Sequence, residues 1–251
     1  MEKKEYDKTA RTYPAVIVLG VIIIAITVII YNNREIILQK LSIYDKFILK
    51  FSSSTIFLTI AKIIPLGLCA TIIIKAFFCF IQLLIRDIGK IFPEAFINYF
   101  FCLPTTQLLL SNNDKYSDTY KNQIFIKIKA SFNIDLKKTH NKTRKNKKYL
   151  KEINEAVALI REKTRDNYIL LNYNKAYGFW RNLTGGVLFI IILVLILLFF
   201  DFLTINLYFL SFTQYLFFII GLILIDLICF FLTLGNGFDY AKQLYSAFLE
   251  K

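Results

Sequence analysis

Long uncharged apolar runs alternate with one long polar block, and this alternation predicts how the chain is organised. The first run, residues 14–30, carries no charge and has Tyr13 and Tyr31 at its ends. About 20 apolar residues cross a bilayer as a helix, and aromatic residues favour its interfaces. We therefore expect a transmembrane helix over about 14–31. A cleaved secretory signal is the other interpretation, but the run is long for one and no small-residue cleavage motif follows it.

The second apolar run, Thr55 to Ile85, is longer than one crossing requires and contains Lys62 and Pro65 near its start. We expect the crossing itself at about 63–85. The connector before it, residues 32–54, places apolar residues at helical spacing between charged ones. That pattern fits either an amphipathic helix on the bilayer surface or a soluble extension of a neighbouring helix.

Two further crossings are expected in the last third of the chain, at about 186–204 and 214–234. The segment between them is short enough to predict a tight hairpin. Gly235-Asn236-Gly237 follows the second of these crossings and is expected to end its helix, since glycine is common just after helix ends. The remaining residues, 238–251, then form a short amphipathic tail.

The polar block, Arg86 to Arg181, reads as mainly helical. Phe92-Pro93-Glu94 begins one helical segment, and Pro104 with two threonines after it is typical of a helix start. Ser117 or Asp118 caps a helix to Phe132, although residues 124–129 alternate as a strand would. Residues 135–148 form a basic loop, and apolar spacing predicts an amphipathic helix from there to about Arg165.

These elements predict an all-α membrane protein with four transmembrane helices and a mainly helical cytosolic domain inserted between the second and third. Residues 1–85 form an N-terminal transmembrane hairpin, 86–181 a basic cytosolic sensor domain, and 182–251 a C-terminal transmembrane hairpin with its tail.

Charge gives this arrangement an orientation. The chain has 31 Lys and Arg against 18 Asp and Glu, and residues 86–181 hold 19 of the former and 9 of the latter, a net charge of +10. Codon bias explains part of the lysine excess, but it does not explain the clustering. Because positive charge flanks crossings on the cytoplasmic side, we expect a multi-pass protein of the bacterial inner (cell) membrane with both termini and the central domain in the cytoplasm.

Enzymatic and metal chemistry find little support in the residues present. No glycine-rich phosphate loop, nucleophile elbow or HExxH motif occurs. The single histidine, His140, lies in the basic loop, and none of the four cysteines forms a CxxC pair. We expect neither an enzyme nor a metal or other cofactor.

A dense basic cluster lies in the middle of the polar block. A solvated loop, a contact with anionic lipid, and a site for phosphates are all compatible with it. Its distance along the chain from both neighbouring crossings favours a nucleotide or short oligonucleotide ligand. The candidate ligand-binding residues are Lys137, Lys138, Lys142, Arg144, Lys145, Lys147 and Lys148.

Three charges interrupt the apolar runs: Lys75, Asp201 and Asp226. A charge at the bilayer centre costs about 2.5–3.5 kcal/mol on the mildest scale, so such residues usually face protein or water. We expect Asp201 at the interface. Asp226 either pairs with Lys75 or lines a water-filled path. Four helices cannot enclose a pore, so a channel requires a homo-oligomer, with a tetramer expected.

Two patches, together with the layout, resemble bacterial membrane effectors of anti-phage defence of the Hailong type. They are Leu103-Pro104-Thr105-Thr106-Gln107-Leu108-Leu109 with the following Asp114, and Tyr177-Gly178-Phe179-Trp180-Arg181-Asn182-Leu183. The resemblance implies an oligomeric ion channel gated by a nucleotide signal from a nucleotidyltransferase encoded alongside. Opening such a channel depolarises the infected cell, a form of abortive infection.

The patches place Thr105, Thr106, Tyr177 and Arg181 at the junction of domain and membrane. A structural interpretation of the second patch is also available: Gly178 lets the chain turn into the bilayer and Trp180 anchors at its surface. The alternative function, from another class, is a non-enzymatic membrane scaffold or accessory protein whose basic domain binds a partner or anionic lipid.

Overall fold

The computed structural model describes residues 2–32, 66–100, 102–111, 113–136, 146–203 and 211–251, and the regular structure within these ranges is helical. Residues 118–132 form a helix, which confirms the helical interpretation of that segment. The elements in chain order are α1 (Glu2–Asp7), η1 (Lys8–Thr12), α2 (Tyr13–Asn32), α5 (Leu66–Gly89), η2 (Lys90–Glu94), α6 (Ala95–Phe100), α7 (Pro104–Gln107), α8 (Asp118–Phe132), α9 (Lys147–Lys163), α10 (Tyr168–Leu203) and α11 (Phe212–Glu250).

Three helical stretches of the described chain are long and apolar enough to cross a membrane, as is typical of a membrane protein. They are Glu5–Thr27, Tyr168–Leu203 and Phe212–Glu250. The expected crossings at 14–31, 186–204 and 214–234 fall largely within them. α5 covers most of the expected crossing at 63–85, whose first residues, like the connector after Asn32, lie outside the described residues.

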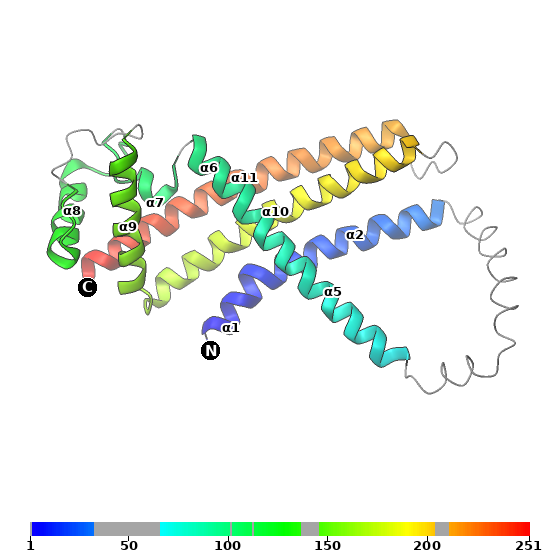
Figure 1. Cartoon of the computed structure of the whole chain (residues 1–251), viewed down its shortest axis with the longest axis horizontal. Helices are drawn as coiled ribbons and strands as arrows, with labels where there is room; N and C mark the ends of the chain where they lie inside the picture. The colour runs from blue at the N-terminus through cyan, green and yellow to red at the C-terminus, as the bar shows by residue number, and fades with distance from the viewer. Residues whose placement is uncertain (1, 33–65, 101, 112, 137–145, 204–210) are drawn as a thin grey trace, which may run out of the picture.

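Helices α10 and α11 form a long antiparallel hairpin that spans the molecule (Figure 1). The expected helix end at Gly235-Asn236-Gly237 is wrong, because α11 continues to Glu250. No described glycine has the positive φ of a helix-ending turn. A glycine inside a helix costs about 1 kcal/mol, and burial of the apolar side chains that follow offsets it. The expected turn at Gly178 is wrong for a similar reason, since Gly178 lies inside α10.

The expected helix start at Phe92 is also wrong. The chain runs from α5 through η2 into α6 without an intervening loop. Pro93 lies inside η2, a short π-helix with hydrogen bonds between residues five apart. This wider turn accommodates a proline that would break an α-helix.

One hydrophobic core, which we call the bundle, joins α7, α8, α9 and the C-terminal half of α11. Residues 238–251, which we expected to form a tail, therefore pack within the bundle. Ser117 caps α8 by accepting a hydrogen bond from the backbone N–H of Tyr120, as its position predicted. The bundle core includes Leu108, Ile124, Ile128, Tyr149, Ile153, Ile160, Leu244, Tyr245 and Phe248.

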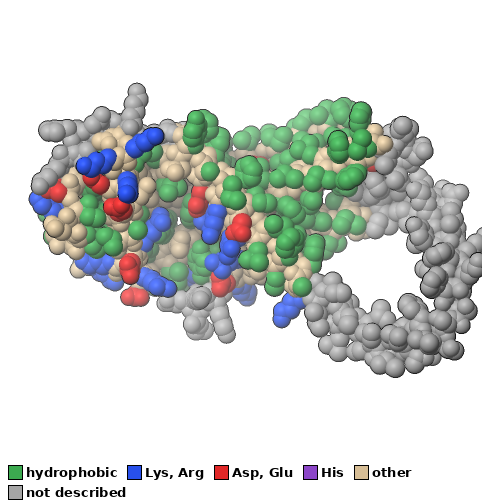
Figure 2. Space-filling model, in the orientation of Figure 1, with side chains coloured by type: hydrophobic (Ala, Val, Ile, Leu, Met, Phe, Trp, Pro, Cys, Tyr) green, Lys and Arg blue, Asp and Glu red, His purple; other side chains and the backbone are tan. Residues whose placement is uncertain are grey.

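A second core, which we call the long-helix core, joins α2, α5, α10 and the N-terminal half of α11. It contains Ala15, Val18, Ile81, Ile85, Val187, Ile190, Val194, Tyr215 and Leu222. Figure 2 shows hydrophobic side chains covering the half of α10 and α11 that lies away from the bundle. Lys, Arg, Asp and Glu gather over the bundle and where α5 crosses α10. The C-terminus lies at the bundle, whereas α1 lies beside the first half of α10 (Figure 1).

Candidate functional site

The two sequence patches, 103–109 and 177–183, meet on α11. A Cβ atom at Gly237 would lie 3.0 Å from Pro104 Cγ and 3.2 Å from Tyr177 Cε2. Gly237 therefore serves as the contact surface for both patches. Tyr177 also stacks on Tyr240 of α11, with ring centroids 6.3 Å apart and planes 11° apart.

Thr105 and Thr106 are buried and hold α7 within the bundle. The Tyr245 hydroxyl donates to the Thr105 carbonyl oxygen at 2.6 Å. The Thr106 hydroxyl donates to Asn154 Oδ1 on α9 at 2.9 Å. These contacts tie α7 to α11 and to α9, so both threonines fix the packing between helices.

Arg181 and Tyr177 join α10 to η2. Arg181 Nη1 donates to Glu94 Oε1 at 2.6 Å, and the Arg181 side chain is 13 % exposed. The Tyr177 hydroxyl donates to the same oxygen at 3.4 Å. Arg181, Tyr177 and Glu94 therefore form a partly buried cluster that holds η2 against α10.

A run of side-chain contacts leads from α9 to this ion pair. The Arg161 guanidinium of α9 lies 5.8 Å from the centre of the Tyr240 ring on α11. Tyr240 stacks on Tyr177 of α10, which reaches Glu94. Four segments distant in sequence are thus connected by aromatic and charged side chains.

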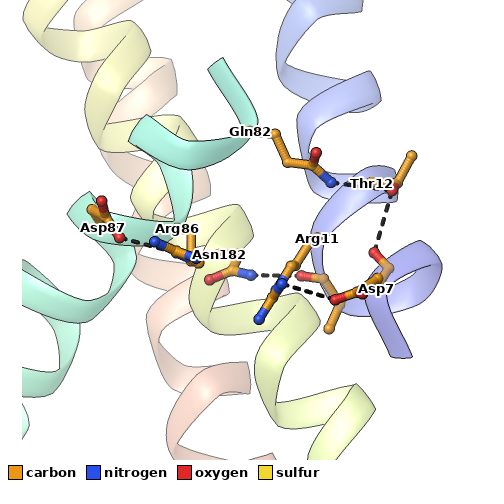
Figure 3. Close-up of polar contacts among 8 residues, drawn as sticks. Asp7, Arg11, Thr12, Gln82, Arg86, Asp87 and Asn182 are labelled. Atoms are coloured by element: carbon orange, nitrogen blue, oxygen red, sulfur yellow. Dashed lines mark hydrogen bonds and ion pairs between the residues drawn. The ribbon is translucent and has the colours of Figure 1, made fainter. Parts of the chain in front are cut away.

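The N-terminal segment meets α10 next to this ion pair, which the sequence did not predict. Asn182 Nδ2 donates to the carbonyl oxygen of Ala10 at 2.6 Å (Figure 3). Ala10 lies in η1, where the π-helical pattern changes which backbone carbonyls are engaged within the helix. Nearby, Gln82 of α5 donates to Thr12 Oγ1 at 3.2 Å (Figure 3).

Lys175 and Gly178 extend the same contact along α10. Lys175 is 5 % exposed and its ammonium lies 3.0 Å from Glu5 Oε1. A Cβ atom at Gly178 would lie 3.0 Å from Ala10 Cβ and 3.2 Å from the Tyr6 hydroxyl oxygen. One signal for this interface exists in the sequence: residues 178, 182, 185 and 186 share a helix face, and three of them are glycine.

Helices α5 and α10 pass each other at what we call the crossing point, formed by Gly89, Gly185 and Gly186. A Cβ atom at Gly185 would lie within 2.6 Å of Gly89 Cα, and one at Gly89 would lie 2.7 Å from the Arg181 carbonyl oxygen. Gly186 faces Val18 of α2 in the same way. Only glycine permits this approach of three helices.

Of the predicted basic cluster, Lys147 and Lys148 are described. They are exposed and occupy the first turn of α9, which corrects their expected place in a loop. Lys147 borders an open hollow of about 490 Å³ along α9, together with Lys151, Asn154 and Glu155. The other candidates, Lys137, Lys138, Lys142, Arg144 and Lys145, lie outside the described residues.

The three charges in the apolar runs have different surroundings. Asp201 is 6 % exposed and accepts a 2.6 Å hydrogen bond from the Tyr215 hydroxyl, so it ties α10 to α11. Asp226 Oδ1 is buried without a hydrogen-bond partner, whereas Lys75 is exposed. Lys75 and Asp226 do not pair within the described chain.

Comparisons with known proteins add no relative. A scan against protein-family models, a search of curated proteins and a search of solved structures each found no match for this chain.

Proposed function

We propose that this protein is a bacterial membrane effector in which a nucleotide or short oligonucleotide, bound by the bundle in the cytoplasm, gates an ion channel formed by several copies. The supporting observation is the continuity of α10 and α11. α11 buries Tyr215 and Leu222 in the long-helix core and Leu244 and Phe248 in the bundle. A ligand that shifts the bundle moves the same rigid helix at its other end.

The proposed topology has four crossings, with α5 as the second, and the bundle and both termini in the cytoplasm. Positive charge near the helix ends supports this orientation. Five basic residues belong to segments near the crossing point: Lys8, Arg11, Arg86, Lys90 and Arg181. The inner membrane as location follows from the same proposal.

The proposed ligand site is the basic cluster at 137–148. Lys147 and Lys148 are exposed on α9 and free to meet phosphates, and α9 is the helix whose Arg161 begins the contacts that lead to Glu94. Lys and Arg contribute to nucleic-acid affinity mainly by releasing the counterions of phosphates. Each lost phosphate contact should therefore flatten the salt dependence by about one unit of slope.

The channel itself requires more than one copy, and a homotetramer is the assembly that we propose. A nucleotidyltransferase encoded alongside would supply the ligand. The role in anti-phage defence rests on the resemblance of the two patches and the layout, and it belongs to the same proposal.

The decisive experiment measures ion flux from liposomes that contain the full chain, with and without short oligonucleotides. We expect the oligonucleotide to change the flux and Lys147→Gln/Lys148→Gln to weaken that response. The matched control is Lys163→Gln/Arg165→Gln, which removes the same charge at and just beyond the C-terminal end of α9. If the two variants weaken the response to the oligonucleotide equally, the basic cluster is not the ligand site. Flux that no oligonucleotide alters would overturn the gating proposal and favour the scaffold function.

A further inference from the structure

Three charged side chains lie within the apolar stretches of the described helices: Lys75 on α5, Asp201 on α10 and Asp226 on α11. Asp201 has a partner inside the chain, the hydroxyl of Tyr215. The remaining two carry opposite charges, and neither forms an ion pair within the described chain.

Asp226 lies at the wall of a largely apolar cavity of about 260 Å³ between η2, α6, α10 and α11. Its Oδ1 atom is buried and has no hydrogen-bond partner. Thr184 is the one other polar side chain that lines this cavity, and its hydroxyl is already engaged by the Trp180 carbonyl at 3.0 Å and Thr233 Oγ1 at 3.2 Å. The cavity therefore presents a carboxylate without a cation. Its remaining walls are Phe92, Pro93, Phe96, Leu188, Leu227 and Phe230.

Lys75 belongs to an apolar face of α5 that the chain leaves uncovered. Ile74, Phe77 and Phe80 on this part of the helix are 66 %, 53 % and 56 % exposed. Beyond Ile81 and Ile85, which pack in the long-helix core, this half of α5 diverges from α10 and α11 (Figure 1). The ammonium group of Lys75 is therefore accessible to a carboxylate of another molecule.

We propose that Lys75 of one copy forms an ion pair with Asp226 of the neighbouring copy, an inference that rests on the proposed membrane oligomer. Ionisable side chains inside membranes pair with one another or face water. Each copy supplies one ammonium and one carboxylate, so a head-to-tail ring uses every charge. The rings of Phe92, Phe96 and Phe230 suit a cation on an apolar stem, because aromatic faces attract cations.

Disulfide cross-linking of the full chain tests this pair. The native cysteines Cys69, Cys79, Cys102 and Cys229 are replaced by serine, then Lys75→Cys and Asp226→Cys are introduced together and the membranes are oxidised. We expect a ladder of linked chains on a non-reducing gel, since each copy links to the next. The matched control is Lys75→Cys with Leu224→Cys, at an exposed α11 position close to Asp226, which should give no ladder.

Charge exchange provides a second measurement that does not depend on cysteines. Lys75→Asp and Asp226→Lys alone each place like charges together, so each should reduce the fraction of oligomer in detergent. The two changes combined should restore it. Circular dichroism confirms that every variant is helical.

Three results would overturn the proposal. Cross-links that form only within one chain would place Lys75 against its own Asp226. An intact oligomer that gives no ladder, or an oligomer fraction that charge exchange does not change, would overturn the ion pair between Lys75 and Asp226. Neither result would contradict the proposed channel. A chain that is monomeric in membranes would overturn the pair and the oligomeric channel together.

Discussion

Arg181 of α10 donates a 2.6 Å hydrogen bond to Glu94 of η2, and the same Glu94 oxygen accepts a hydrogen bond from Tyr177. This contact fixes the segment that leaves α5 against the helix that connects the bundle to the apolar hairpin. It lies one helical turn from Gly185, so the close approach of α5 and α10 and the ion pair support each other.

Glu94→Gln should destabilise the protein by about 1–3 kcal/mol, because a partly buried arginine loses its charged acceptor. The midpoint of thermal unfolding in detergent measures this effect. Asp239→Asn is the control, since Asp239 is 58 % exposed and lies 3.9 Å from Lys242. Exposed pairs of this kind contribute about 0–1 kcal/mol. Equal shifts for the two variants would contradict the structural role of Glu94.

Gly185→Ala should separate α5 from α10. The added Cβ would approach the backbone of Gly89, which cannot move as a side chain can. Overpacking of this kind costs about 1–3 kcal/mol. Gly221→Ala is the matched control, because nothing lies within 4 Å of its Cβ position. Alanine there should be neutral or stabilise α11 by up to about 1 kcal/mol. Thermal unfolding of both variants compares the two positions, and equal midpoints would argue against a tight crossing point.

The topology prediction uses single cysteines in a chain without its native ones. Ser111→Cys and Ser246→Cys belong to the bundle side and should react with a membrane-impermeant thiol reagent only after the cells are opened. Ser211→Cys, exposed at the start of α11, should react in intact cells. Labelling of Ser111→Cys or Ser246→Cys from outside would overturn the model with four crossings.

The bundle should lose stability at alkaline pH through Tyr149. Its side chain is fully buried, and burial followed by the nearby Glu152 charge raises its pKa above the ordinary value of 10.0. A raised pKa means that the folded state favours the neutral hydroxyl. This contribution is fully present below pH 10 and decreases as the pH rises above it. Tyr149→Phe should show a weaker loss of stability above pH 10 than the parent, as measured by denaturant unfolding across this range. If the stability of Tyr149→Phe falls above pH 10 as steeply as that of the parent, other tyrosines cause the loss.

Local signals predicted much of the fold. Apolar run length located α2, α10 and α11, and apolar spacing located α9. Ser117 was recognisable as a cap because capping depends only on nearby residues. These features are encoded within one or two helical turns of sequence.

Long-range packing explains what the sequence could not predict. Gly235-Asn236-Gly237 favours a helix end locally, but burial of Tyr245 and Phe248 in the bundle keeps α11 helical. The contact between Asn182 and Ala10 joins residues 172 positions apart. Part of the candidate ligand site, Lys137 to Lys145, lies outside the described residues, so that part stays a prediction.

The continuity of α11 also constrains how this gene can change in length. Each residue of an α-helix turns the chain by about 100°. One codon inserted near Gly235 would therefore rotate Tyr240, Leu244 and Phe248 out of the bundle while Tyr215 and Leu222 kept their places. Insertions and deletions between these two halves should be tolerated only when they restore the rotational phase, whereas point substitutions on the exposed side of the same turns remain free to accumulate.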